Sequence, residues 1–236
     1  MTSGDQEPAP DARRVHLGVD GTRGRWISVA IDDGGAFLGA RLLDTLAEVM
    51  DAYPGAVTVA IDVPIGLPER GPRAADLEAK MLLGSRRSTI FPVPPRAVLE
   101  AASYGEARAI AQELTGKSIS AQSFALRHNI LEAAPLGADE RVFEVHPELA
   151  FSALAGRVLQ SSKRTWNGAQ ERRACLASAG LVLPADLGEA GAAPVDDVLD
   201  AAVCAWSARR ISGGEGRHVP EQPERDGAGR PMSIWF

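Results

Sequence analysis

The sequence is poor in cysteine, in aromatic residues and in long apolar runs. The 236 residues include two cysteines, Cys175 and Cys204, which are too few for a disulfide framework or a four-cysteine zinc site. No run approaches the roughly 18 apolar residues that a membrane span requires, and residues 1–14 lack the apolar core of a secretory signal. These absences predict a cytoplasmic protein with no membrane partner.

Positive charge is also scarce. The chain has 25 Lys and Arg residues against 31 Asp and Glu, for a net charge of -6. This balance excludes a generally basic nucleic-acid coat, although a local basic groove is compatible with it. Aromatic residues make up 5% of the chain, so few platforms for base stacking are available. Carboxylates, in contrast, are the ligands that hard cations prefer, and the composition therefore suits metal binding.

The first part of the chain has the pattern of a β-meander after a polar tail. The tail, residues 1–14, is predicted to be disordered. Asp-Asp-Gly-Gly at 32–35 is a typical hairpin signal, and a continuous apolar run at 57–61 is typical of a strand buried on both faces. The expected elements are strands at 15–20, 26–31 and 36–43, a helix at 43–53 and a strand at 57–61.

The rest of the chain predicts an insertion followed by an alternation of strand and helices. The insertion, about 64–136, is rich in proline and is expected to form loops at 64–72 and 84–96 around a helix at 74–83. The other expected elements are helices at 103–115, 120–134, 147–156, 168–179 and 195–211, and strands at 141–145 and 231–236. We therefore expect one α/β domain over 15–236, with an antiparallel three-strand meander, then parallel strands, and helices on both faces.

Three acidic residues lie within or directly after predicted strands. Asp20 follows Val-His-Leu-Gly-Val, Asp62 directly follows Val-Thr-Val-Ala-Ile, and Glu144 lies within Arg-Val-Phe-Glu-Val. The carboxyl ends of strands are where open α/β sheets form ligand sites. Each residue also has a plainer interpretation: a turn at Asp20-Gly21, a cap or turn at Asp62, and a solvent-facing charge on an edge strand at Glu144.

Two further aspartates share one face of the predicted helix at 195–211. Asp197 and Asp200 are three residues apart, so their Cβ atoms lie about 5–6 Å from each other. Asp196 and Asp197 could simply complement the helix dipole, but that explanation does not reach Asp200. The following residues, 201–208, carry no charge, and a helix that is apolar nearly all round is buried. These aspartates are therefore expected to face a cleft.

Carboxylates that converge in this way must be neutralised. Two charges about 4 Å apart repel by roughly 4 kcal/mol at an effective dielectric near 20, and either raised pKa values or divalent cations remove that cost. Oxygen ligands favour Mg²⁺ or Mn²⁺, and a pair of such ions supports phosphodiester cleavage. Our candidate catalytic residues are Asp20, Asp62, Asp197, Asp200 and Glu144, of which the four aspartates are the candidate metal ligands.

Two basic segments, 70–96 and 157–173, are candidates for guiding a phosphate backbone. Solvated surface charge explains them equally well, except at Arg86-Arg87-Ser88, which precedes a proline-stiffened loop suited to clamping a phosphate. His146 could assist as a general base or could stand at a helix start beside Pro147. The candidate substrate-binding residues are Arg86, Arg87, Ser88 and Arg96.

Five separated motifs together resemble the DUF429 family, whose members are described as predicted ribonuclease H-like nucleases. The motifs are GVDGTRGRW (18–26), AIDVPIGLP (60–68), LGSRRSTIFPVPPR (83–96), EVHPELAF (144–151) and DDVLDAA (196–202). The resemblance implies a ribonuclease H-like fold in which Asp20 is the first-strand acid and Asp62 the fourth-strand acid. Asp197 and Asp200 are similar to the pair on the last helix of Holliday-junction resolvases of the RuvC type. Glu144 has no firm counterpart there.

Three functions remain open from the sequence. The first is a Mg²⁺- or Mn²⁺-dependent nuclease that acts on DNA or RNA. The second is an actin-like, ATP-dependent phosphotransferase, because Asp-Gly-Thr-Arg-Gly at 20–24 resembles the first phosphate loop of that superfamily. The third is a non-catalytic module that binds nucleic acid or protein. The oligomeric state is open, with a homodimer among the options.

Overall fold

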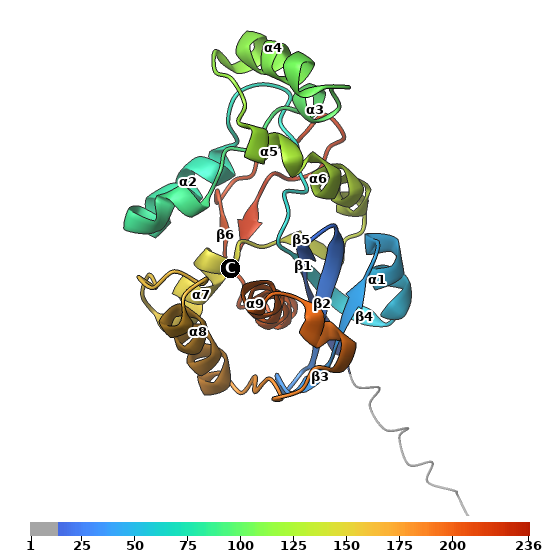
Figure 1. Ribbon diagram of the computed structural model, residues 1–236, viewed down its shortest axis with the longest axis vertical. Coiled ribbons are helices and arrows are strands. Elements are labelled where there is room, and N and C mark those ends of the chain that lie inside the picture. Colours follow the sequence, from blue (N-terminus) through green and yellow to red (C-terminus); the bar gives the residue numbers. More distant parts are fainter. Residues whose placement is uncertain (1–13) are drawn as a thin grey trace, which may run out of the picture.

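The computed structural model describes residues 14–236, so the predicted disordered tail at 1–14 lies almost wholly outside the described residues. The described chain forms a mixed five-stranded sheet whose two faces are covered by helices (Figure 1). Helices α2 to α6 stand together at one end of the molecule, between β4 and β5 in the chain (Figure 1). None of the helices within 14–236 is long and apolar enough to cross a bilayer.

The sheet has the expected combination of a meander and parallel strands. Its order is β3-β2-β1-β4-β5; β1, β2 and β3 pair antiparallel, whereas β4 runs parallel to β1 and β5 parallel to β4. The prediction of an α/β fold with this mixed sheet is confirmed. The strands are β1 (Val15–Thr22), β2 (Arg25–Asp32), β3 (Phe37–Leu43), β4 (Ala56–Ile61) and β5 (Val142–Glu144).

The two hairpin turns decide where Asp20 lies. The β2–β3 turn is the predicted one: Asp32 accepts from the Ala36 N–H at 2.9 Å, and Gly35 has a φ of 84°. The β1–β2 turn instead uses Arg23 and Gly24, both with positive φ. Asp20 is therefore inside β1, paired with Ile27, and the alternative of a turn at Asp20-Gly21 is wrong.

The helices differ from expectation at three places. Helix α1 begins after β3 with a capping box between Thr45 and Glu48, rather than at 43. The expected single helix at 120–134 is broken, because the Leu126 N–H turns to Phe124 O and a second helix starts at Arg127. The expected loop at 84–96 opens with a 3₁₀ turn, Gly84–Thr89. The α-helices are α1 (Leu46–Ala52), α2 (Ala74–Leu83), α3 (Arg96–Leu99), α4 (Tyr104–Thr115), α5 (Ala121–Ala125), α6 (Arg127–Ala133), α7 (Pro147–Ala155), α8 (Trp166–Ser178) and α9 (Val195–Ser212).

Each face of the sheet has its own apolar core. On one face, Ile27, Val29 and Ile31 of β2 pack with α7, α8 and α9. On the other face, Leu17 and Val19 of β1 pack with α1 and α6. Side chains alternate between the faces along a strand, so Gly18 and Asp20 are on the α9 face.

A glycine lets α9 lie directly on β1. A Cβ atom on Gly18 would stand 2.0 Å from Ala201 O and 2.1 Å from Ala205 N, and no side chain fits that gap. The facing part of α9 is correspondingly small, with Ala201, Cys204 and Ala205 all fully buried. The helix backbone is thus held against the centre of the sheet.

The C-terminal segment forms a separate two-stranded ribbon. Strands β6 (His218–Val219) and β7 (Ile234–Trp235) pair antiparallel, and Trp235 makes a parallel bridge to Val145 after β5. A strand was expected over 231–236, and it proves shorter and belongs to this ribbon. The ring of Trp235 meets Phe143 edge-on at 5.2 Å between centroids, which ties the chain end to the main sheet.

We predict that Gly18→Ala destabilises the protein by about 3 kcal/mol, because the new methyl group must push α9 off β1. The matched control is Gly39→Ala in β3, where a Cβ meets no atom within 4 Å. Urea unfolding followed by circular dichroism measures both free energies. Equal midpoints for the two variants would show that α9 is not held at this contact.

Candidate acidic site

The strand register brings two predicted acids side by side. In the parallel pair, Gly18 aligns with Ala60 and Val19 with Ile61, so Asp20 and Asp62 come next to each other on the α9 face. The Asp62 N–H donates to Val19 O at 2.9 Å, which holds Asp62 at the end of β4. The sequence prediction of converging strand-end carboxylates is thereby confirmed for this pair.

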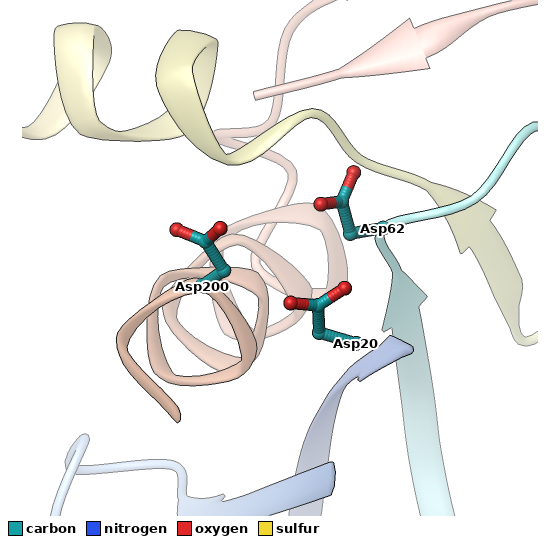
Figure 2. Close-up of side chains that lie close together, drawn as sticks. All are labelled: Asp20, Asp62 and Asp200. Carbon is teal, nitrogen blue, oxygen red and sulfur yellow. The ribbon is translucent and has the colours of Figure 1, made fainter. Parts of the chain in front are cut away.

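Helix α9 supplies the third carboxylate. Asp200 is one turn before Cys204, whose backbone lies over Gly18, and its side chain points toward the other two acids (Figure 2). One carboxylate oxygen from each of Asp20, Asp62 and Asp200 lies within 4.8 Å of the others. We call these three residues the acidic triad.

The triad is buried, and one of its oxygens has no partner. Asp20 is 6% exposed and Asp200 is 1% exposed, whereas Asp62 is partly open. Asp200 Oδ1 makes no hydrogen bond to any described residue. A buried, unpaired acceptor is costly and uncommon in native proteins. The triad therefore offers a cation three carboxylate ligands, including a buried oxygen that has no hydrogen-bond partner.

Burial raises the pKa of every triad member, and repulsion from other triad carboxylates adds to it at Asp20 and Asp62. Burial, with repulsion from Asp200, raises the pKa of Asp62 to about 8. Burial also raises the pKa of Asp200 to about 6 and, with repulsion from Asp62, raises that of Asp20 well above its ordinary value.

The sequence reasoning missed Lys163 as a member of the site. Its ammonium group is ion-paired with Asp200 Oδ2, and the side chain is 29% exposed. Attraction to the triad raises the pKa of Lys163 despite the opposing effect of burial. Lys163 was noted only as one of several cations in the basic segment 157–173, and nothing in its local pattern distinguishes it from Arg164.

Asp197 lies outside the triad, although it was predicted as a metal ligand. It is partly exposed and is not among the described groups that come within 4.8 Å of one another. Burial raises its pKa, and the hydroxyl of Thr22 opposes that effect. Asp197 is nearly one helical turn before Asp200, so its carboxylate is displaced toward the N-terminal end of α9, where it lies beside the Thr22 hydroxyl.

Glu144 is held in a buried ion pair with Arg73. The guanidinium of Arg73 donates to both Glu144 oxygens, at 2.6 and 2.8 Å, and also to Asp76 at 2.6 Å. Glu144 also accepts from the Ile65 N–H at 2.9 Å. In the sheet Glu144 aligns with Ile61, so its side chain leaves on the face opposite Asp62. At 7% exposure the interpretation as a solvent-facing edge charge is wrong, and both oxygens already have partners.

A cavity of about 530 Å³ opens over the triad. Its lining includes cations from both predicted basic segments, Arg86 from one and Lys163 and Arg164 from the other. His146 also lines it; burial lowers the pKa of His146 to about 4, so the ring is neutral at pH 7. The remaining polar side chains that line the cavity are Arg73, Asp76, Thr89, Asn129, Glu144, Glu148 and Ser162.

The other predicted substrate-binding residues do not line this cavity. Arg87 and Ser88 are exposed on the 3₁₀ turn Gly84–Thr89. Arg96 forms ion pairs with Glu100 at 3.4 Å and with Asp226 at 4.0 Å. Of the four predicted phosphate contacts, the structure therefore places Arg86 at the cavity.

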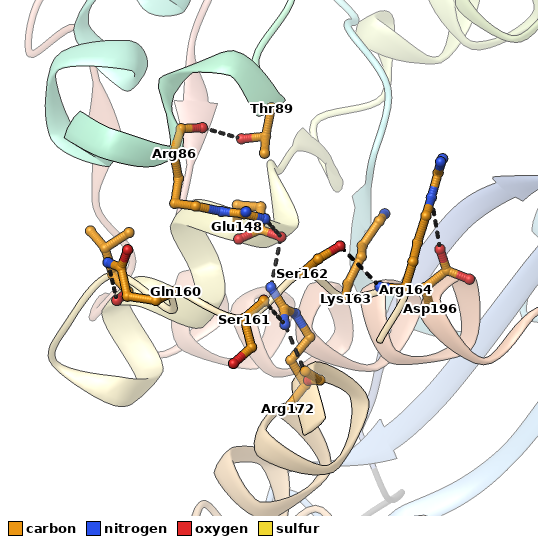
Figure 3. A network of polar contacts seen from close by, with 12 residues as sticks. Arg86, Thr89, Glu148, Gln160, Ser161, Ser162, Lys163, Arg164, Arg172 and Asp196 are labelled. Atoms are coloured by element: carbon orange, nitrogen blue, oxygen red, sulfur yellow. Dashed lines mark hydrogen bonds and ion pairs between the residues drawn. The ribbon is translucent and has the colours of Figure 1, made fainter. Parts of the chain in front are cut away.

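A second buried network fixes the basic wall of the cavity. Glu148 accepts from Arg172 at 2.7 Å and pairs with Arg86 at 3.6 Å (Figure 3). Arg172 also donates to Ser161 O and Gly168 O, each at 3.1 Å. The network joins α7, α8 and the turn Gly84–Thr89, so Arg86 and the loop that carries Lys163 share one support.

Comparison with protein families gives one match. The family described as "Protein of unknown function (DUF429)" matches residues 18–225, which include the triad and the cavity. The chain belongs to the DUF429 family. Searches of curated proteins and of solved structures gave no significant match. The family description names no activity, so the case for a function rests on the residues of this DUF429 chain.

The raised pKa of Asp62 predicts that the metal-free protein loses stability as the pH rises from 6.5 to about 8. In this window the folded state keeps protons that the unfolded state, in which aspartate titrates near 3.8, has already released. The lowered pKa of His146 acts in the opposite direction, but only below 6.5. Asp62→Asn removes much of this pH dependence and is more stable than wild type at pH 8 by about 1–2 kcal/mol. Urea unfolding in chelator at pH 6.5, 7.5 and 8.5 measures this, and parallel pH profiles would contradict it.

Glu144 is predicted to matter for stability rather than for metal binding. Glu144→Gln breaks a buried charge pair and lowers the free energy of unfolding by about 3 kcal/mol, while the affinity for Mn²⁺ stays within about threefold of wild type. Glu140→Gln, at an exposed site, is the control. Thermal unfolding and calorimetric titration measure the two effects. Lost Mn²⁺ binding in a still folded Glu144→Gln variant would place Glu144 among the ligands.

Proposed function

We propose that the acidic triad holds a divalent cation and that the protein is a metal-dependent nuclease, which hydrolyses phosphodiester bonds of DNA or RNA. The observation that carries the proposal is the convergence of the acidic triad at the floor of a cavity that Arg86, Lys163 and Arg164 also line. An acidic floor suits a metal ion, and a basic wall suits the phosphate that such an ion would act on.

The donor set fits Mg²⁺ or Mn²⁺. All three ligand atoms are carboxylate oxygens, which hard divalent cations prefer, and no cysteine or histidine belongs to the triad. Asp200 Oδ1 offers a buried lone pair without a partner. The charge of a bound cation would also favour the ionised form of all three carboxylates, which burial disfavours. The triad thus has chemical reasons to bind such an ion.

The fold is consistent with a ribonuclease H-like arrangement. That arrangement was expected to start with an antiparallel meander, to continue with parallel strands, and to carry acids on the first strand, the fourth strand and the last helix. The sheet order β3-β2-β1-β4-β5 and the positions of the triad on β1, after β4 and on α9 support it. We include this fold assignment in the proposal.

The carboxylates at the floor of the cavity and the polar side chains in its wall have different proposed roles. A bound divalent cation supplies a Lewis acid and lowers the pKa of water at the site. Asp20, Asp62 and Asp200 fix where that charge lies, because β1, β4 and α9 are rigidly packed. Arg86, steadied by Glu148, is positioned to bind a phosphate oxygen. His146, neutral at pH 7, presents an unpaired buried Nδ1 and can accept a hydrogen bond or a proton.

The test is metal binding and cleavage in variants of the triad. Asp62→Asn and Asp200→Asn are expected to weaken Mn²⁺ binding at least about a hundredfold, since even outer-shell changes cost 10–100-fold, and to abolish metal-dependent cleavage while the fold is kept. The control is Asp196→Asn, one turn earlier on α9, whose carboxylate pairs with Arg164 at 3.8 Å. Calorimetry gives the affinities, and gel assays on single-stranded and duplex DNA and RNA give the activity.

The outcomes separate the three functions considered from the sequence. Binding of Mn²⁺ without turnover of any nucleic acid favours a non-catalytic module with a structural ion. Saturable ATP hydrolysis favours the phosphotransferase. Cleavage that survives unchanged in a folded Asp62→Asn variant overturns the nuclease site proposed above.

A further inference from the structure

The ammonium group of Lys163 lies beside the acidic triad, where a positive charge offsets the charge of the three carboxylates. Among the described residues, it is the one cation ion-paired with a triad carboxylate, through Asp200 Oδ2. Attraction to Asp62 and Asp20 adds to that of Asp200. The arginines nearby are committed elsewhere, Arg73 to Glu144 and Asp76 and Arg172 to Glu148. The triad therefore has a cation of its own, carried on a flexible side chain.

The backbone that carries Lys163 is held firmly on both sides. Arg172 donates to Ser161 O at 3.1 Å (Figure 3). The Thr165 hydroxyl donates to Ser162 O at 2.8 Å. A Cβ atom on Gly168 would stand 2.0 Å from Ser162 O, so α8 lies tight against this loop. The loop cannot move away easily, but the four-carbon side chain of Lys163 can turn about its own bonds.

A divalent cation in the triad would conflict with this ammonium group. Both would bind Asp200, and two positive charges about 4 Å apart repel by several kcal/mol at an effective dielectric near 20. Lys163 already lines the cavity and is partly exposed, so it has a route away from Asp200. Arg86 lines the same cavity, and a displaced Lys163 would join it there.

We propose that Lys163 is a built-in counter-ion, which neutralises the acidic triad in the metal-free protein and is displaced from Asp200 into the cavity by a divalent cation. There, together with Arg86, it binds the phosphate group of the substrate. The inference rests on the proposed function, since it assumes that the triad binds metal. It assigns Lys163 two positions, one facing Asp200 and one facing the substrate.

Lysine acylation of the wild-type protein tests the displacement directly. The chain has three lysines, Lys80, Lys117 and Lys163, and Lys117 is exposed and serves as the internal reference. Acetylation with an N-hydroxysuccinimide ester, read by peptide mass spectrometry, should increase severalfold at Lys163 when Mg²⁺ is saturating, while Lys117 is unchanged. Unchanged or reduced labelling of Lys163 in the metal-bound protein overturns the displacement.

Variants test the competition with metal. Lys163→Met should bind Mn²⁺ about tenfold more tightly than wild type at pH 8, because no ammonium group has to leave, and should cleave with a raised KM because a phosphate contact is lost. Lys163→Arg should restore the weaker, wild-type-like Mn²⁺ affinity. Lys117→Met, at an exposed residue that does not line the cavity, should leave Mn²⁺ affinity unchanged. Equal affinities for Lys163→Met and wild type overturn the proposal.

A metal-free experiment keeps this inference separate from the nuclease proposal. In chelator, Lys163→Met should lower the melting temperature in the wild-type background but have little effect in an Asp200→Asn background, because the partner charge is gone. Equal effects in both backgrounds would refute the counter-ion role. Failure of the wild-type protein to bind Mn²⁺ at all would refute both the displacement and the metal site, even if the counter-ion role held.

Discussion

The close contact between α9 and β1 at Gly18 is the constraint on which the rest of the site depends. Because no Cβ fits between Gly18 and the backbone of Ala201 and Ala205, the helix axis is fixed relative to the sheet within a narrow range. Asp200, one turn before Cys204 on the same helix, is thereby held next to Asp20 on β1 and Asp62 after β4. A larger residue at position 18 would move the carboxylate of Asp200 away from the other two.

Buried charged groups are compensated to different extents in three parts of the described chain. Arg73 is matched by Glu144 and Asp76, and Arg172 is matched by Glu148 together with two backbone oxygens. In these two networks each carboxylate is bound directly by a guanidinium group, which is what burial of charge demands. The triad does not balance, since three carboxylates face one lysine. The two arginine networks are structural ion pairs, whereas the triad keeps negative charge that a bound cation would neutralise.

The residues of the site that could be predicted are those whose place follows from a local sequence pattern of a strand or a helix. The positions of Asp20 and Asp62 directly after apolar strand segments indicated these two residues, and a spacing of three on α9 narrowed the helix acids to two, of which Asp200 joins the triad. Lys163 and Arg73 could not be found in this way, because each reaches its partner across a distance in sequence that no local pattern encodes. The same reason explains Glu144: its strand was predicted, but its partner, 71 residues away, was not.

The floor of the cavity, formed by the acidic triad, could be predicted from the sequence, whereas the ion pairs that set its wall, formed by Arg86 and the loop that carries Lys163, could not. This difference bears on the proposed function. The floor is built from sheet and helix, whose geometry follows from backbone hydrogen bonding and close packing, and it holds groups that must be placed to a fraction of an ångström. The wall is built from the turn Gly84–Thr89 and the loop before α8, which are set by long-range ion pairs through Glu148 and Arg172. If the proposed function holds, changes in the wall would alter which phosphate-bearing substrate is accepted while the carboxylates stay in place. The proposed chemistry is therefore tied to the sheet and α9, whereas the proposed substrate preference is tied to ion pairs between residues that lie far apart in the sequence.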